Sequence, residues 1–206
     1  HETTSAYKVN ELDVFSDCNN SKMSIIASIP NHDNSPWYIK MENRAKFWNK
    51  YAIKKGFEIK GNYNAYIVEF VINGKINNNP IKIKGHRQLS NVSSGIIPKK
   101  GRFFEKLTIN IISTRIQSKY YLYVKKKGLF AFLTRRSNQS VSIGKYVISY
   151  NSKEVLDLLK VSKILESDNL VRLSITKSGF KMKLFELPAN DEKLNNLKRL
   201  WEQNYS

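Results

Sequence analysis

Apolar, β-branched segments of strand length recur along most of this chain, and short polar turns separate them. Two of the connections indicate hairpins, one at Asn73-Gly74, a type I′ turn signal, and one at Lys177-Ser178-Gly179. Strands joined by short turns pair antiparallel, so the pattern predicts an antiparallel sheet. The expected strands cover residues 22–29, 63–72, 106–112, 117–124, 129–134, 141–150, 170–175 and 181–187.

Helical spacing is confined to three short segments. In the first, near 41–55, apolar residues from Met41 to Ala52 recur at intervals of three and four, and Gly56 ends the pattern. The second is expected near 152–160. The third, near 191–201, has acidic residues at its start and basic residues near its end, as the helix dipole favours. The sequence therefore predicts an α+β fold, an antiparallel β-sheet-rich single domain over residues 1–206 with about three short helices.

Positive charge is concentrated in the middle of the chain. The 206 residues carry a net charge of +18, and residues 70–150 contain 16 Lys and Arg but a single acid, Glu105. The flanking segments are nearly neutral although they are equally rich in Asn and Lys, so a general compositional bias does not explain the asymmetry. Because like charges repel and oppose compaction, we expect this basic middle to meet a partner that neutralises it. Nucleic acid, an anionic surface and an acidic protein all fit.

Residues 118–136 favour a β-hairpin with a basic tip. Tyr121 and Tyr123 should share one strand face, next to cations, a combination that binds single-stranded nucleic acid. A plain hairpin with a solvated lysine tip is the alternative. Further basic clusters extend the prediction to a polyanion-binding set: Lys82, Lys84, Arg87, Lys99, Lys100, Arg102, Tyr121, Tyr123, Lys125, Lys126, Lys127, Arg135 and Arg136.

Only one segment is compatible with catalysis. Glu58-Ile59-Lys60 has the Glu-x-Lys spacing of metal-dependent nucleases, with Asp33 upstream as a possible second ligand. Such triplets arise by chance in a Lys-rich chain, and the Pro-Asp pair expected before them is missing. No His or Cys pattern has metal-ligand spacing, and no Gly-rich loop could hold a phosphate. We therefore expect no catalytic residue, no metal and no cofactor, and a small nuclease using Glu58 and Lys60 is kept as an alternative.

The apolar stretches are shorter than the roughly 20 residues that span a bilayer, so no transmembrane helix is expected. The chain begins with His1 rather than Met, which indicates a processed or excised segment and favours a secreted or periplasmic location. Its end, residues 174–201, resembles in outline the last strand pair and helix of small bacterial extracytoplasmic β-rich proteins. The leading hypothesis is a non-catalytic binding or assembly domain for a polyanionic or acidic partner, and an extracytoplasmic structural module of a larger bacterial complex is a further alternative.

Overall fold

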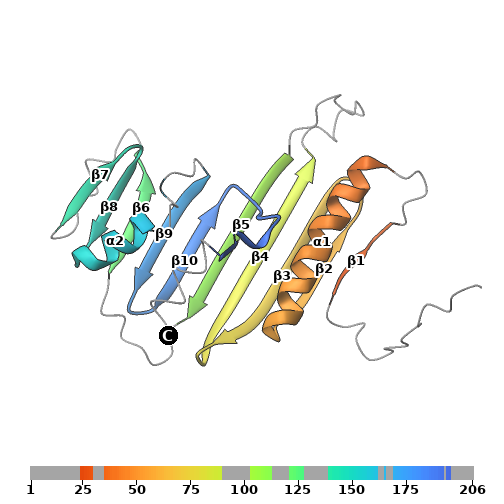
Figure 1. The fold of residues 1–206 in the computed structure, drawn as a ribbon, viewed down its shortest axis with the longest axis horizontal. Coiled ribbons are helices and arrows are strands. Elements are labelled where there is room, and N and C mark those ends of the chain that lie inside the picture. The colour runs from red at the N-terminus through yellow and green to blue at the C-terminus, as the bar shows by residue number, and fades with distance from the viewer. Residues whose placement is uncertain are drawn as a thin grey trace, which may run out of the picture.

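The fold is known from a computed structural model that describes residues 24–29, 35–89, 103–112, 121–127, 139–161, 165, 169–192 and 194–195. Within these residues ten strands form one sheet in the order β1-β2-β3-β4-β5-β10-β9-β6-β8-β7 (Figure 1). The strands are β1 Ile25–Ala27, β2 Glu58–Tyr63, β3 Ile67–Ile76, β4 Asn79–Leu89, β5 Phe103–Ile112, β6 Leu122–Lys126, β7 Ser140–Ile143, β8 Tyr146–Tyr150, β9 Leu170–Thr176 and β10 Gly179–Leu184.

Neighbouring strands pair antiparallel except β1, which is parallel to β2. This confirms the broad prediction of an α+β fold built on an antiparallel sheet. The sheet order departs from the chain order at two places, because β8 lies between β6 and β7 and the last two strands of the chain are also displaced. β10 and β9 lie between β5 and β6, so the last strands of the chain are inserted beside the middle ones.

The prediction of three helices is not confirmed. The long helix α1 spans Pro36–Lys55 and the short helix α2 spans Lys153–Val161. Of the third predicted helix, residues 191, 192, 194 and 195 are helical and residues 196–201 lie outside the described part of the chain. In that part, no helix is long and apolar enough to cross a membrane.

Helix α1 begins five residues before the predicted start because its first turn is set by Pro36 rather than by apolar spacing. Pro is favoured at the first helical position, where its fixed φ is already helical and its missing N–H is not needed. At the other end Gly56 adopts the left-handed conformation, with φ 64°, and its N–H donates to the Ile53 carbonyl. The predicted end of the helix is therefore correct.

The hairpin after β3 exists, but the predicted turn is wrong. β3 continues through Asn73 and Gly74, and the chain reverses at Asn77 and Asn78, which have φ of 46° and 66°. Asn tolerates this left-handed conformation, so both sites could have formed the turn. A Cβ at position 74 would overlap the Phe57 ring, so Gly74 serves a close approach between elements instead of a turn.

Of the other predicted connections, one is confirmed and others differ from the prediction. The hairpin of β9 and β10 is confirmed. The single strand expected over 141–150 is a hairpin of β7 and β8, which turns at Gly144 with φ 53°. β6 does not form one arm of a basic-tipped hairpin, because it is an inner strand paired with β8 on one side and β9 on the other. The predicted second arm, residues 129–134, lies outside the described residues.

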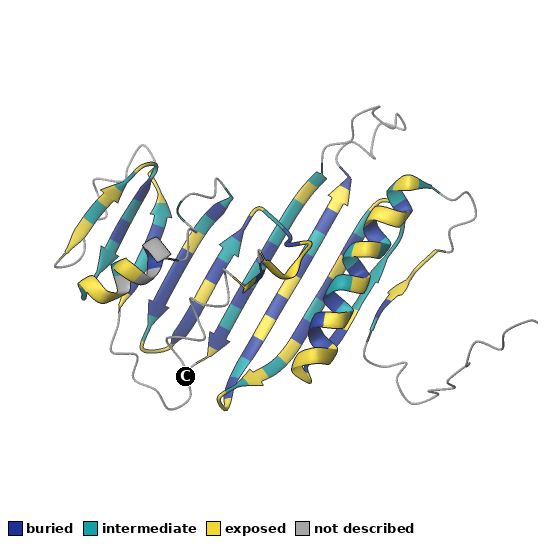
Figure 2. Cartoon of the chain, in the orientation of Figure 1, coloured by how far each residue is buried: buried dark blue, intermediate teal, exposed yellow. Residues whose placement is uncertain are grey.

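Buried and exposed residues alternate along the strands (Figure 2). Successive strand side chains point to opposite sides, so the buried residues, nearly all apolar, share one side of the sheet, which we call the core face. Helix α1 lies across β1, β2 and β3 on this face, and α2 lies beside β8 (Figure 1). Leu187 and Leu194, after β10, are buried in the same core. The Trp48 ring of α1 packs on Phe70 of β3 with centroids 4.9 Å apart, and so joins the helix to the sheet.

We predict that Gly85→Ala lowers the free energy of unfolding by about 1–3 kcal/mol, as overpacking of a core does. A Cβ at position 85 would overlap the Phe70 ring, which packs on Trp48 with ring centroids 4.9 Å apart. Urea denaturation measures the loss, and the double variant Gly85→Ala/Phe70→Leu should recover part of it. An unchanged unfolding free energy in the single variant would show that Phe70 is free to move.

Candidate functional site

The side of the sheet opposite the core face carries most of its cations, and we call it the open face. Strand pairing aligns five of these cations in one line across the sheet, on β2, β4, β10, β9 and β6. Uncharged Val71 and Thr108 occupy the two positions between them, on β3 and β5. We call these five residues the cation row: Lys60, Lys84, Lys183, Arg172 and Lys125.

A hollow of about 460 Å³ lies on the open face at the centre of the cation row. Its cations come from β4 on one side and from β10 and β9 on the other. β5 lies between them and contributes the short polar side chains Thr108 and Asn110. Among the described residues, five cations and no carboxylate line the hollow: Lys82, Lys84, Arg172, Lys181 and Lys183.

The Asn110 amide is unusual among the described residues because its Oδ1 is buried and has no hydrogen-bond partner. Buried polar atoms are almost always paired, and the side-chain amide can present either its oxygen or its NH2 to a neighbour. Asn110 lines the hollow. The NH2 group of this amide can donate to an anion held by the surrounding cations, whereas the unpaired Oδ1 can only accept a hydrogen bond.

A second hollow, of about 580 Å³, adjoins the first and shares Lys84 and Thr108 with it. It extends the open face toward β2 and β3. His86, Phe104 and Lys106 line it together with Glu69. Together the two hollows form one shallow groove that crosses the strands from β2 to β9, and we call it the basic track.

The carboxylates that the structure describes on the open face lie at one end of it. Glu58 bonds to Lys60 at 2.7 Å, and Glu69 lies 3.8 Å from Nδ1 of His86. Both acids belong to β2 and β3. Along the described lengths of β4, β5, β10, β9 and β6, the outward positions contain no acid. Within the described parts of these five strands, no outward carboxylate offsets the positive charge.

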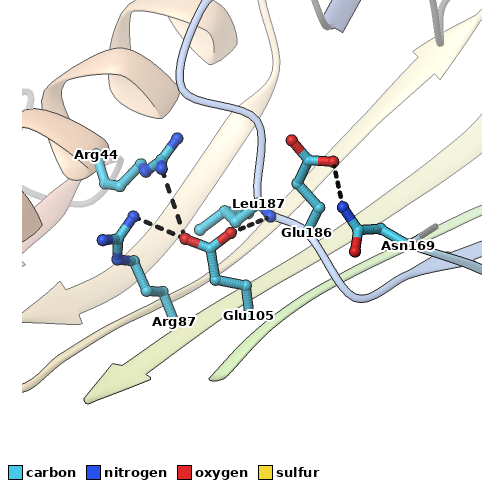
Figure 3. Close-up of polar contacts among 6 residues, drawn as sticks. All are labelled: Arg44, Arg87, Glu105, Asn169, Glu186 and Leu187. Atoms are coloured by element: carbon cyan, nitrogen blue, oxygen red, sulfur yellow. Dashed lines mark hydrogen bonds and ion pairs between the residues drawn. The ribbon is translucent and has the colours of Figure 1, made fainter. Parts of the chain in front are cut away.

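Glu105, the single acid of the basic middle, is on β5 but faces the core side (Figure 3). Its Oε1 accepts a 2.7 Å hydrogen bond from Arg87 of β4 and lies 3.5 Å from Arg44 of α1. Its Oε2 accepts a 3.0 Å hydrogen bond from the Leu187 backbone N–H. One carboxylate therefore links the helix, two strands and the segment after β10.

The two arginines are committed to this cluster. Burial lowers the pKa of Arg44 from its ordinary value, and the charge of Glu105 opposes that effect. Burial also lowers the pKa of Arg87, and the charge of Glu105 again opposes that effect. The Arg87 guanidinium stacks on the Phe103 ring, 3.9 Å from the ring centroid. An arginine so placed is a structural cation rather than a surface ligand for a polyanion.

The residues predicted to bind a polyanion therefore lie in different parts of the structure. Lys82, Lys84, Tyr123 and Lys125 lie on the open face. Tyr121, Lys126 and Lys127 are exposed at the ends of β6, and Arg87 belongs to the core face. Lys99, Lys100, Arg102, Arg135 and Arg136 lie outside the described residues. Polyanion binding by any of these residues stays a prediction.

Sequence reasoning missed three of the five cations that line the smaller hollow. Lys181 and Lys183 flank the buried Met182, and Arg172 precedes the buried Leu173, so strand alternation alone would have marked all three as outward. They were overlooked because they belong to a nearly neutral segment. Only the insertion of β10 and β9 beside β5 brings them to the basic middle.

The nuclease alternative gains no support from the geometry. The Glu58 carboxylate forms an ion pair with Lys60, which lies two residues further along the same strand. Asp33 is outside the described residues. In the part of the chain that is described, no three His, Cys, Asp or Glu side chains come together as metal ligands would.

Comparison with known proteins identified no relative. No protein-family model matches the chain, and neither do any curated protein or any solved structure. Inferences about function therefore depend on the charge and geometry of this chain itself.

We predict that Glu105→Ala lowers the free energy of unfolding by about 2–4 kcal/mol, because it leaves two partly buried arginines unpaired. This expected loss is at or below the loss caused by breaking a fully buried ion pair, because the Glu105 side chain is 17% exposed. Glu58→Ala is the matched control, because it removes a carboxylate from a pair that is 41% and 66% exposed. Its effect should stay within about 0.5 kcal/mol. Equal losses in urea denaturation would contradict a structural role for the Glu105 cluster.

Proposed function

We propose that this protein is a non-catalytic binding module whose open sheet face engages a polyanion. The observation that carries the proposal is the cation row, five positive side chains aligned across seven neighbouring strands with no acid among them. Such an arrangement repels itself unless counterions or a ligand neutralise it. A bound polyanion would provide that neutralisation along the row beyond Lys60, which is already paired with Glu58.

The shape of the surface favours an extended ligand. Neighbouring strands are about 4.8 Å apart, so the row from β2 to β6 covers roughly 29 Å. A chain of anionic groups that lies across the strands would meet a cation at every first or second strand. The two adjoining hollows follow the same direction and share Lys84 and Thr108. A flexible polyanion could therefore sit in one continuous track.

An enzymatic role has less in its favour. The open face offers cations and hydrogen-bond donors, but the carboxylates near it are paired with Lys60 or lie close to His86. General acid–base catalysis needs a titratable group within reach of the reacting atoms, and an activated nucleophile needs a base beside it. Binding requires only the charges and the polar floor that are present.

We predict that the triple variant Lys84→Gln/Arg172→Gln/Lys183→Gln binds a model polyanion such as heparin or oligo-dT at least tenfold more weakly at low salt. Each lost phosphate contact should make the slope of log affinity against log salt shallower by about 0.7 on a single strand. Fluorescence anisotropy over a salt series measures both quantities.

The control is Lys46→Gln/Lys50→Gln/Lys54→Gln, which removes the same charge from the exposed side of α1, across the sheet from the open face. Its affinity and slope should change much less. If both variants lose affinity equally, binding follows net charge and not the cation row. An affinity of the unaltered protein that does not respond to salt would refute the proposed function itself.

A further inference from the structure

Two phenylalanine rings stand exposed on the open face beside the cations. Phe104 is 49% exposed and Phe185 is 45% exposed. Their ring centroids are 6.0 Å apart, and the His86 ring lies 6.1 Å from Phe104. Burying a Phe side chain is worth roughly 1.5–3 kcal/mol, so leaving two together in solvent forgoes stability. An exposed aromatic pair of this kind indicates a contact surface.

The rings are joined to the basic track. Phe104 lines the larger hollow with Lys84 and Lys106, and the Lys183 Nζ lies 5.3 Å from the Phe185 ring centroid. On the other side of the smaller hollow, the Arg172 guanidinium lies 5.0 Å from the centroid of Tyr123. Rings therefore border the row of cations at two separate places on one sheet face.

The presence of aromatic rings beside cations on one face favours one class of polyanion over others. Polyphosphate, sulfated polysaccharides and acidic peptides offer charge but no regular planar rings to stack. A nucleic acid duplex encloses its bases, so the flat sheet face would meet only its backbone. Single-stranded nucleic acid offers phosphates and unstacked bases together, and proteins bind it with cations along the backbone and aromatic rings under the bases.

We infer that the open face binds single-stranded nucleic acid, with bases stacked on Phe104 and Phe185 and phosphates held by Lys84, Lys106 and Lys183. This inference rests on the proposed function, because it names the class of polyanion that the same surface takes. The Thr108 hydroxyl and Asn110 amide, on β5 between the cations, add hydrogen-bond donors for the backbone. Base identity has little influence, since every base has a face that can stack.

The test compares two ligands that differ only in their bases, oligo-dT and an abasic oligonucleotide of the same length. Both carry the same phosphates, so the cations contribute equally to their affinities. Oligo-dT should bind at least tenfold more tightly. Phe104→Ala and Phe185→Ala should each reduce that ratio severalfold and leave the affinity for the abasic strand nearly unchanged.

Two further variants guard against misfolding and indirect effects. Ile53→Ala removes an exposed apolar side chain from α1, away from the open face, and should leave the ratio intact. Phe104→Trp keeps a stacking ring, so it should retain the preference for oligo-dT. Its added indole fluorescence should be quenched when oligo-dT binds and unaffected by the abasic strand.

The outcomes distinguish the identity of the polyanion from polyanion binding itself. Equal, salt-dependent binding of oligo-dT and the abasic strand would overturn the inference while the polyanion proposal stands. So would a poly-glutamate of matched charge, or a duplex of equal length, that binds as tightly as oligo-dT. A lack of salt-dependent binding to every one of these ligands would overturn the proposed function as well.

Discussion

The carboxylate of Glu105 is the interaction on which the arrangement of this molecule depends. It accepts a hydrogen bond from Arg87 on β4 and one from the Leu187 N–H after β10, and it lies within ion-pair distance of Arg44 on α1. These groups come from parts of the chain up to 143 positions apart in the sequence, from 44 to 187. The same bond has a second consequence. Because Glu105 points to the core face, the single acid of residues 70–150 is on that side, and the outward positions of β4 and β5 have no carboxylate.

Alternation along the strands turns this local pairing into two faces of different chemistry. Ile81, Ile83, Leu107 and Ile109 point into the core, so the residues between them must point away from it. The cations among those intervening residues are held apart by strand geometry, about one strand spacing or two from each other. Because they sit on paired strands rather than on long loops, their positions are set by the backbone hydrogen bonds of the sheet. A ligand would meet cations on an ordered backbone, and the ordering cost of binding would come from the lysine and arginine side chains.

The sheet order is the step that local patterns could not supply. β9 begins 20 positions after the end of β8 and β10 follows it, yet β9 pairs with β6 and β10 pairs with β5. Their insertion makes β6 an inner strand and brings Arg172 and Lys183 beside Lys125 and Lys84. The turn after β3 was misplaced for a related reason. Asn73-Gly74 and Asn77-Asn78 are both acceptable turns locally, and the packing of Phe57 against position 74 selects the second.

The sequence by itself determined what depends on neighbours along the chain: the strand-rich α+β class, the end of α1 at Gly56, the hairpin of β9 and β10, and the concentration of charge in residues 70–150. Turn chemistry and residue alternation act over a few positions, so they can be read without a fold. The tertiary structure alone decided which face Arg87 and Glu105 occupy and which distant cations join one row. Those outcomes depend on strand pairing between segments far apart in sequence, and pairing is selected by the total burial of the core rather than by any one segment.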